Sequence, residues 1–370
     1  MVSRIILDDD SGYQLLRLLL QNEVNPWVLT PSPLEFSAVR DYLRERFQLK
    51  AETLARLKSI QVSTESLWAR DWAPLMTLPN TEYAGQPINV RMLDAKYLSE
   101  RPIDDSVPRQ IQMSLLEQTN ALPGWQFRLQ DLPLYMEGGN IMCSRENCFL
   151  TEEVLIQNSP EAVGKEALKA PQIVTILERY LDQKVWLVPR MPHESTGHLD
   201  MWAKLLNADT LVIAQLSPQT LDFVPDELRQ HYQEVRAFLD QQATGQTAEG
   251  KPVETALGPL LKRLNPALKI VRIPMPAPGI YGESEVFRSY TNSLLVNGKA
   301  IVPRYQRMGG VGYYYPDRSL VKDYEERVES IYKQAGYEVS WLNADYLIQD
   351  GGAWHCATMQ VPQATSPHSH

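Results

Sequence analysis

Gly351-Gly352-Ala353-Trp354-His355-Cys356 is the last of five polar motifs whose spacing predicts the fold. The glycine pair lets the backbone turn tightly, because glycine has no Cβ that would clash. Cys356 follows this turn, whereas the other two cysteines, Cys143 and Cys148, lie close together in the sequence. A cysteine in this setting is a candidate nucleophile, although a free cysteine is more often a small buried hydrophobic residue. The motifs upstream decide between these two interpretations.

The five motifs are centred on Asp71, Glu137, His198, Asn292 and Cys356, with gaps of 66, 61, 94 and 64 residues. Three gaps are nearly equal, and we interpret residues 216–268 in the long one as an insertion. A unit of roughly 60 residues, each copy sending a polar group to one end, indicates pseudo-symmetric blades around a central pocket. The order of elements within the units predicts an α/β fold.

Residue patterns before and between the five motifs predict the secondary structure. Apolar runs predict strands at 26–30, 60–63, 184–188, 211–215, 269–273 and 338–342. Helical spacing of apolar residues predicts helices at 33–49, 107–119, 160–181, 225–242 and 324–335. Residues 132–150 are interpreted as a strand, a hairpin and a second strand, and Asn297-Gly298 as a tight hairpin turn. We expect one catalytic domain over residues 1–362, followed by a polar, disordered tail at 363–370.

Composition narrows the class of protein. The 370 residues are 44% hydrophobic and 22% charged, which is within the ordinary globular range and sufficient for a large core. A net charge of −9 argues against nucleic acid or an anionic membrane as the main partner and favours a cationic ligand. Residues 1–12 show no signal-peptide pattern, so we expect a cytoplasmic protein, with an exported mature domain as the alternative.

Cys143 and Cys148 flank a short polar turn. They could face each other across a hairpin and form a disulfide. The composition nevertheless favours two unpaired thiols, as in most cytoplasmic proteins.

Two motifs place an acid beside groups that favour a binding site. Asp71 follows Arg70 within the stretch Trp68-Ala69-Arg70-Asp71-Trp72. The two flanking tryptophans argue against a solvent-exposed loop and favour a binding site. The alternative for this pair is a local ion pair. Glu137 precedes Gly138-Gly139, which would let a bound group approach the backbone. Its alternative is an exposed carboxylate at a strand end.

The segment from His193 to Trp202 carries two histidines, and a zinc site must be tested here. The metalloprotease motif needs two histidines four residues apart on one helix face. Here His193 and His198 are five apart, with Gly197 between them, so we exclude that motif. His198 and Asp200 would instead point the same way on a strand, an arrangement suited to acid–base chemistry and cation binding. A surface hydrogen bond between them is the alternative.

Together the motifs would place a thiol, an imidazole and three carboxylates in one pocket. A thiolate beside a histidine is a nucleophile with its acid–base partner. Three carboxylates repel an anion and favour a cation. A guanidinium is planar and donates paired N–H groups to carboxylates. Asp71 and Asp200 could each bind one edge of it, and the thiolate could attack its central carbon.

The stretches WARDWAP, MEGGN, TGHLDMWAK, YTNSLLVN and GGAWHC resemble, in this order, the motif series of the agmatine deiminase and Porphyromonas-type peptidylarginine deiminase family. The resemblance covers about residues 68–360. It implies a pentein fold, a five-bladed α/β propeller, and hydrolysis of a guanidinium to a ureido group and ammonia without a metal or organic cofactor. The substrate would be a small molecule or a peptide carrying a guanidinium, and a homo-oligomer is compatible with it.

The resemblance also implies roles for individual residues. Cys356 would form a covalent thiouronium-type adduct, and His198 would protonate departing ammonia and then activate water. Asp71 and Asp200 would bind the guanidinium, and Glu137 would assist the histidine. The remaining substrate-binding residues implied are Asn292, Trp68 and Arg101.

The sequence departs from the family pattern in two places. The stretch DAKYLSERPIDD resembles a region with two arginines that suit a substrate carboxylate, but here Arg101 matches one and Ser99 stands at the other. Cys143-Ser144-Arg145 replaces the Asp-Gly usual after the GGN motif. Agmatine and peptidyl-arginine both remain candidate substrates. A non-catalytic binder of cationic ligands and an amidinotransferase are the alternative functions.

Overall fold

The computed structural model describes residues 1–78, 88–117, 125–144, 146–222, 224, 226–281, 284–305, 313–314 and 318–361. The tail at 363–370 lies outside them. The chain divides into two compact units. Unit 1 comprises Met1–Gly138, Thr175–Asp182 and Cys356–His370, and unit 2 comprises Gly139–Val174 and Gln183–His355. The single catalytic domain over 1–362 therefore stays a prediction.

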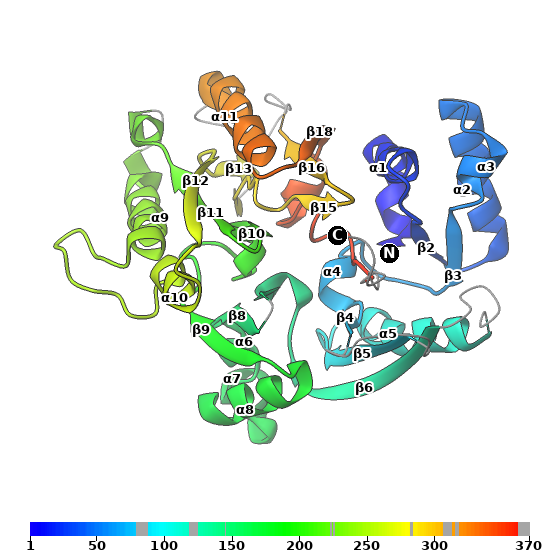
Figure 1. Ribbon diagram of the computed structural model, residues 1–370, viewed down its shortest axis with the longest axis horizontal. Coiled ribbons are helices and arrows are strands. Elements are labelled where there is room, and N and C mark those ends of the chain that lie inside the picture. Colours follow the sequence, from blue (N-terminus) through cyan, green and yellow to red (C-terminus); the bar gives the residue numbers. More distant parts are fainter. Residues whose placement is uncertain are drawn as a thin grey trace. The chain divides into compact units, whose positions relative to one another are not determined.

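Unit 1 contains two three-stranded sheets (Figure 1). The first is wholly parallel and joins β1 (Val2–Ser3), β2 (Trp27–Thr30) and β3 (Lys58–Gln61). Its connections contain α1 (Asp10–Gln21), α2 (Pro33–Phe47) and α3 (Ala51–Leu54). The second joins β4 (Leu75–Thr77), β5 (Ile88–Lys96) and β6 (Trp125–Tyr135), with α4 (Ala69–Trp72) before it and α5 (Pro102–Glu117) between its parallel strands.

Unit 2 contains four three-stranded sheets within the described residues. Three of them are mixed: β7 (Ile141–Cys143), β8 (Asn147–Thr151) and β9 (Lys184–Val188); β10 (Ala203–Asn207), β11 (Thr210–Leu216) and β12 (Lys269–Met275); β15 (Leu294–Val296), β16 (Lys299–Arg304) and β18 (Glu338–Asn343). The fourth joins β14 (Ser284–Val286), β13 (Gly279–Tyr281) and β17 (Tyr313–Tyr314). Helices α6 (Glu153–Gln157), α7 (Pro160–Val163), α9 (Asp226–Thr244), α10 (Leu257–Leu264) and α11 (Val321–Gln334) lie in the connections. Helix α8 (Ala170–Leu181) begins in unit 2 and belongs to unit 1 from Thr175 onward.

The predicted repeat is present in the sheets. Four sheets share one topology, in which an antiparallel pair is followed by a strand parallel to its second member. Their first strands begin at Leu75, Ile141, Ala203 and Leu294, and a polar motif ends just before each of them. Residues 216–268, predicted as an insertion, form the long crossover from β11 to β12 with α9 and α10, and α9 lies beside β11 (Figure 1).

The two chain ends complete the first sheet of unit 1. The N-terminal ammonium of Met1 donates to the Met359 carbonyl, and the Met359 N–H donates to the Met1 carbonyl, the pattern of an antiparallel pair. The segment after Cys356 therefore pairs with β1, which is itself parallel to β2. This is the same antiparallel-then-parallel order as in the other repeats, so the fifth motif also precedes a strand-like segment.

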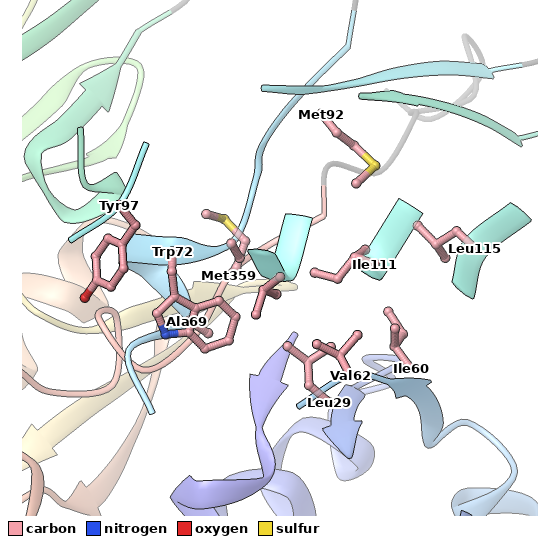
Figure 2. Close-up of a cluster of buried hydrophobic side chains, with 12 residues drawn as sticks. Leu29, Ile60, Val62, Ala69, Trp72, Met92, Tyr97, Ile111, Leu115 and Met359 are labelled. Carbon is pink, nitrogen blue, oxygen red and sulfur yellow. The ribbon is translucent and has the colours of Figure 1, made fainter. Parts of the chain in front are cut away.

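A hydrophobic cluster forms the core of unit 1 (Figure 2). It packs Ile111 and Leu115 of α5 with Leu29 of β2, Ile60 of β3 and Met92 of β5. Trp72 of α4 and Met359 of the C-terminal segment belong to the same cluster. Burial of such side chains stabilises by about 1.5–3 kcal/mol each. The core thus fixes α4 and the C-terminal segment, which carry two of the predicted site residues.

Local sequence explains several element boundaries. The Ser32 hydroxyl accepts from Glu35 N, and Pro33 occupies the first turn of α2, as expected at a helix start. Asn297 and Gly298 both have positive φ, as the predicted hairpin turn requires. The helix predicted over 160–181 is interrupted, because Gly164 has a φ of +60° and ends α7. No helix in the described part of the chain has the length and apolarity to cross a membrane.

The expectation of two unpaired thiols is wrong. Cys143 and Cys148 form a disulfide across the β7–β8 hairpin, where their Cα atoms are 4.0 Å apart. They are directly opposite each other in the antiparallel register, a position that brings side chains close enough to bond. Composition could not reveal this, because the pairing depends on hairpin register.

We expect this disulfide to be measurable by thiol counting and by stability. Denatured, unreduced protein should show one reactive thiol per chain, from Cys356, and reduced protein should show three. Closing so short a loop stabilises by about 2 kcal/mol in the chain-entropy account. The double variant Cys143→Ser/Cys148→Ser should lose this amount in denaturant unfolding and should no longer respond to reductant. Three thiols without reductant would contradict the pairing.

Candidate active site

The short helix α4 carries Asp71 and is hydrogen-bonded to the nucleophile candidate. The backbone N–H of Arg70 donates to the carbonyl of Cys356 at 2.9 Å. The buried Arg70 side chain continues along the same segment, donating from Nη2 to Gln360 Oε1 at 3.0 Å and from Nη1 to Met359 Sδ at 3.4 Å. Arg70 therefore attaches the segment after Cys356 to the helix that carries Asp71. The sequence predicted no such role for it.

The glycine beside Glu137 permits a close approach to the same residue. A Cβ on Gly138 would lie 2.1 Å from the carbonyl oxygen of Arg70, a distance that real atoms do not adopt. The absence of a side chain thus lets the Glu137 segment pack directly on α4. Arg70 has Cys356 on its N–H side and Gly138 on its carbonyl side, so Asp71, Glu137 and Cys356 are brought together within unit 1.

A buried carboxylate fixes the entry to α4. Asp104 is fully buried and accepts from Glu65 N at 2.7 Å and from Ser66 Oγ at 2.7 Å. Ser66 Oγ in turn accepts from Trp72 Nε1 at 2.9 Å. Burial raises the pKa of Asp104, although these hydrogen bonds oppose the rise. The first turn of α5 therefore holds both ends of the WARDW stretch.

Tyr97 is a residue of this half of the site that the sequence did not single out. Burial, and then the carboxylates of Asp71 and Glu137, raise the pKa of Tyr97, while Arg101 opposes the rise. Arg101 Nη1 lies 3.4 Å from the Tyr97 hydroxyl. Trp68, the residue before α4, is half-buried and packs against the hydrophobic core. Asp71, Glu137 and Arg101 thus act electrostatically on one phenol.

In unit 2, His198 and Asp200 do not lie on a strand as predicted. His198 is the residue before a 3₁₀ turn over Leu199–Met201, and β10 begins only at Ala203. The turn closes with a bond from Trp202 N to Leu199 O at 3.2 Å. The period-two argument was wrong because Gly197 has a φ of +69°, which starts a turn rather than a strand. Both side chains are nevertheless buried.

His193 and His198, tested above as a zinc pair, have different surroundings. His193 has a φ of +64° and its Nε2 lies 2.7 Å from Glu234 Oε2 of α9. The His193 ring stacks on His231 of the same helix at 4.0 Å. His198, by contrast, precedes the buried 3₁₀ turn. This separation agrees with the exclusion of the metalloprotease motif.

Asp200 has a partner that the sequence did not predict. His355 Nδ1 lies 2.6 Å from Asp200 Oδ2. Burial raises the pKa of Asp200 most strongly, but the hydrogen bond and charge of His355, with His198 and Lys204, outweigh it and hold the pKa below its usual value. Asp200 is therefore an anion over the neutral pH range. The signal in the sequence was the histidine that directly precedes Cys356.

Asn292 organises the loop that leads to Cys356. Its Oδ1 accepts from Ala353 N at 3.1 Å and from His355 N at 3.1 Å, and its carbonyl accepts from His355 N at 3.2 Å. Its Nδ2 donates to Met201 Sδ at 3.5 Å. Asn292 is fully buried, so it fixes the backbone of the GGAWH loop. A direct role in substrate binding stays a prediction.

The site residues thus form two groups, one in each unit. Unit 1 joins Cys356, Asp71 and Glu137, with Arg101 and Trp68 nearby in the same unit. Unit 2 joins His198, Asp200, Asn292 and His355. The groups are consecutive in the chain at the peptide bond between His355 and Cys356. The residue types they contain, a thiol, imidazoles and carboxylates, are those predicted for a nucleophile, an acid–base group and a cation-binding site.

Comparison with known proteins is consistent with this chemistry. A protein of Photobacterium profundum, provisionally named agmatine deiminase, is 24% identical over 327 residues, covering 83% of this chain and 78% of that protein. Another of Shewanella baltica, with the same provisional name, is 25% identical over 64% of this chain and 59% of its own length. At this level of identity, each is a related protein rather than a near-identical one.

Solved structures show the fold. The agmatine deiminase of C. jejuni has a TM-score of 0.63 at 15% identity, covering 99% of this chain and 93% of that chain. A protein of Porphyromonas gingivalis, provisionally named arginine deiminase, has a TM-score of 0.63 at 18% identity, covering 96% and 90%. The predicted α/β fold of the pentein class is confirmed.

The fold and the similar proteins define a hydrolase of guanidino C–N bonds with a pentein fold. The sequence model for Porphyromonas-type peptidyl-arginine deiminases matches residues 34–362, so the chain belongs to that family.

We expect Asn292→Ala to loosen the loop before Cys356. The substitution leaves the buried Ala353 N–H without its acceptor and weakens the bond to His355 N, at a cost of about 1–3 kcal/mol. Denaturant unfolding measures this loss, and the rate of Cys356 alkylation by iodoacetamide reports on the loop.

Asn343→Ala is the matched control, because Asn343 bonds locally to Asp345, its Oδ1 accepting from Asp345 N at 3.1 Å and its Nδ2 donating to Asp345 Oδ2 at 2.8 Å. Its loss should cost about 1–3 kcal/mol as well, but it should leave the alkylation rate unchanged. Equal stability of the Asn292 variant and the wild type would contradict the assigned role.

Proposed function

We propose that the protein is a cysteine-dependent deiminase that hydrolyses the guanidinium of an arginine derivative to a ureido group and ammonia. The observation that carries this proposal is the backbone of Arg70, which joins Cys356, Asp71 and Glu137 in unit 1. A thiol among carboxylates suits a cationic electrophile, because the carboxylates bind the guanidinium whose carbon the sulfur attacks.

In the proposed mechanism, Asp71 and Asp200 bind the N–H edges of the guanidinium. The Cys356 thiolate adds to the central carbon, forming a C–S bond. The C–N bond to one terminal nitrogen then breaks, and His198 supplies the proton that lets it leave as ammonia. His198 next removes a proton from water, whose oxygen adds to the same carbon. The C–S bond breaks, returning the thiolate and the ureido product, and the proton left on the hydroxyl of the adduct goes to the released ammonia. One guanidinium and one water thus give one ureido group and one ammonium ion.

Asp200 suits its role because it is ionised without a bound cation. Its pKa is held low by His355, His198 and Lys204 in spite of burial. A carboxylate that is already charged can bind the guanidinium by charge-assisted hydrogen bonds. Glu137 is assigned to assist His198, and Asn292 to hold the loop before Cys356.

Among guanidinium substrates, agmatine is favoured over peptidyl-arginine by two observations. Arg101, the candidate partner for a substrate carboxylate, lies at hydrogen-bonding distance from Tyr97, and Ser99 stands where a second arginine would be needed. Agmatine has no carboxylate to bind. The Photobacterium profundum and Shewanella baltica proteins and the C. jejuni structure also bear the name agmatine deiminase. A small cationic substrate therefore fits the acidic residues of unit 1 best.

The disulfide bears on the compartment. A structural disulfide persists in oxidising surroundings and is rare in cytosolic proteins. We therefore favour the exported alternative over the cytoplasmic one. Trapping thiols with iodoacetamide in intact source cells tests this, because a cytoplasmic protein would show three alkylated cysteines per chain and an exported one only one.

We expect Cys356→Ala to abolish turnover while substrate still binds. Wild-type protein should release ammonia and a ureido product from agmatine faster than from peptides with internal or terminal arginine. Loss of the nucleophile should lower kcat by at least about 1,000-fold. Calorimetry should still detect binding of agmatine to the variant, because its carboxylates are intact.

The double variant Cys143→Ser/Cys148→Ser is the control, since its cysteines flank the turn of the β7–β8 hairpin rather than the end that follows Glu137, and it should keep turnover within about threefold. Tight arginine or agmatine binding by wild-type protein without product would support the non-catalytic alternative. Transfer of the amidino group to glycine would identify an amidinotransferase.

A further inference from the structure

Glu194 is a buried carboxylate four residues before His198, and no role has been assigned to it above. Only 2% of its surface is exposed. Its Oε1 accepts from Thr196 N at 3.1 Å, and its Oε2 accepts from Gly197 N at 2.7 Å. The Thr196 hydroxyl lies 2.9 Å from both oxygens. Three donors facing two oxygens match an ionised carboxylate, because a protonated one would present a donor to a donor.

The Thr196 hydroxyl links this carboxylate to His198. The hydroxyl donates its single proton to Glu194 and accepts the backbone N–H of His198 at 3.2 Å. A hydroxyl that donates and accepts in this way fixes both neighbours. The order Glu194, Thr196, His198 is therefore a continuous hydrogen-bonded chain that ends at the proposed acid–base residue.

The turn that contains this chain is enclosed on several sides. Arg190 Nη2 donates to the Glu194 carbonyl at 3.0 Å, and Arg190 Nη1 lies 2.5 Å from Glu153 Oε2. Thr151 Oγ1 lies 2.6 Å from the carbonyl of Gly197. A Cβ on Gly197 would lie 2.5 Å from Glu153 Oε2, so the turn packs directly on that carboxylate. Glu194 is thus held in place and shielded from water.

Glu194 acts on His198 through its charge as well as through the hydrogen-bonded chain. Burial raises the pKa of Glu194 above its usual value, and the charge of His198 and the donors of Thr196 and Gly197 offset only part of this rise. An anion close to an imidazole in a buried site favours the imidazolium. The other charged or titratable groups of unit 2 that act on this turn or on Asp200 beside it are Glu153, Arg190, Asp200, Lys204 and His355.

We propose that Glu194 is a positioning residue for His198, which it orients through the Thr196 hydroxyl and whose protonated form it favours. The proposal rests on the proposed function, since His198 needs a fixed orientation only if it transfers protons to and from the substrate. Glu194 itself touches no reacting atom, and its effect is transmitted by the backbone of residues 196–198 and by its charge.

Thr196→Val tests the hydrogen-bonded link. Valine has the shape of threonine and keeps the methyl group that faces Gly351, but it lacks the hydroxyl. We expect kcat to fall about tenfold or more with KM unchanged within about threefold, because a small displacement of an acid–base group slows chemistry rather than binding. Thr196→Ser keeps the hydroxyl and should retain kcat within about twofold.

Glu194→Gln tests the charge. The alkaline limb of the kcat–pH profile should move to lower pH, because without the nearby anion His198 loses its proton more readily. Thr196→Val leaves the Glu194 carboxylate in place. The alkaline limb of its kcat–pH profile should therefore lie at the same pH as in wild type, although the maximal kcat is lower. A residue with a merely structural role would reduce active protein without moving the limb.

Histidine-labelled protein gives a measurement that does not need turnover. The His198 resonance, identified by its loss in His198→Asn, should titrate at lower pH in Glu194→Gln than in wild type. Wild-type protein that turns over no guanidinium substrate would overturn the proposed function, and the titration would still test the link between Glu194 and His198. An unchanged titration in Glu194→Gln, or unchanged kcat in Thr196→Val, would overturn the inference.

Discussion

The hydrogen bond from the Arg70 N–H to the Cys356 carbonyl is the contact on which the arrangement in unit 1 depends. It joins residues from opposite ends of the chain, and the exchange of backbone hydrogen bonds between Met1 and Met359 extends the contact into the first sheet. Because a backbone group makes this bond, no side-chain choice at position 70 would reveal it. The constraint on sequence appears instead at Gly138, where any side chain would meet the Arg70 carbonyl.

Unit 2 uses buried polar side chains for the same purpose. Asn292 and Glu194 each accept from backbone N–H groups of a loop, and Asn140 Oδ1 accepts from Thr151 N at the end of β8 at 3.0 Å. A buried polar group is costly unless it is hydrogen-bonded, so each tolerates only one loop conformation. Residues that look like ligand-binding groups in sequence can therefore serve to fix the loops that carry the reacting ones.

The sequence predicted the repeat and the reacting residues better than their local conformation. The nearly equal spacing of Asp71, Glu137 and His198 was informative because each of these residues lies four or five residues before the first strand of a sheet. The strand assigned to His198 was wrong, since Gly197 has a positive φ and packs closely against Glu153, and neither feature is visible in the period-two pattern. The disulfide was missed because register, not composition, places Cys143 opposite Cys148. His355 and Tyr97 were missed because their importance lies in contacts with residues distant in sequence.

Tyr97 shows how the acidic residues of unit 1 suit a cation. Its hydroxyl is buried in the field of Asp71 and Glu137, and the resulting rise in its pKa keeps the phenol neutral. A neutral phenol adds a hydrogen-bonding group without adding a further negative charge beside Asp71 and Glu137. Arg101 lies beside the phenol and opposes the effect of these carboxylates on it. Because carboxylates bind a planar cation through paired, charge-assisted hydrogen bonds, this group of residues is better suited to a guanidinium than to an anion.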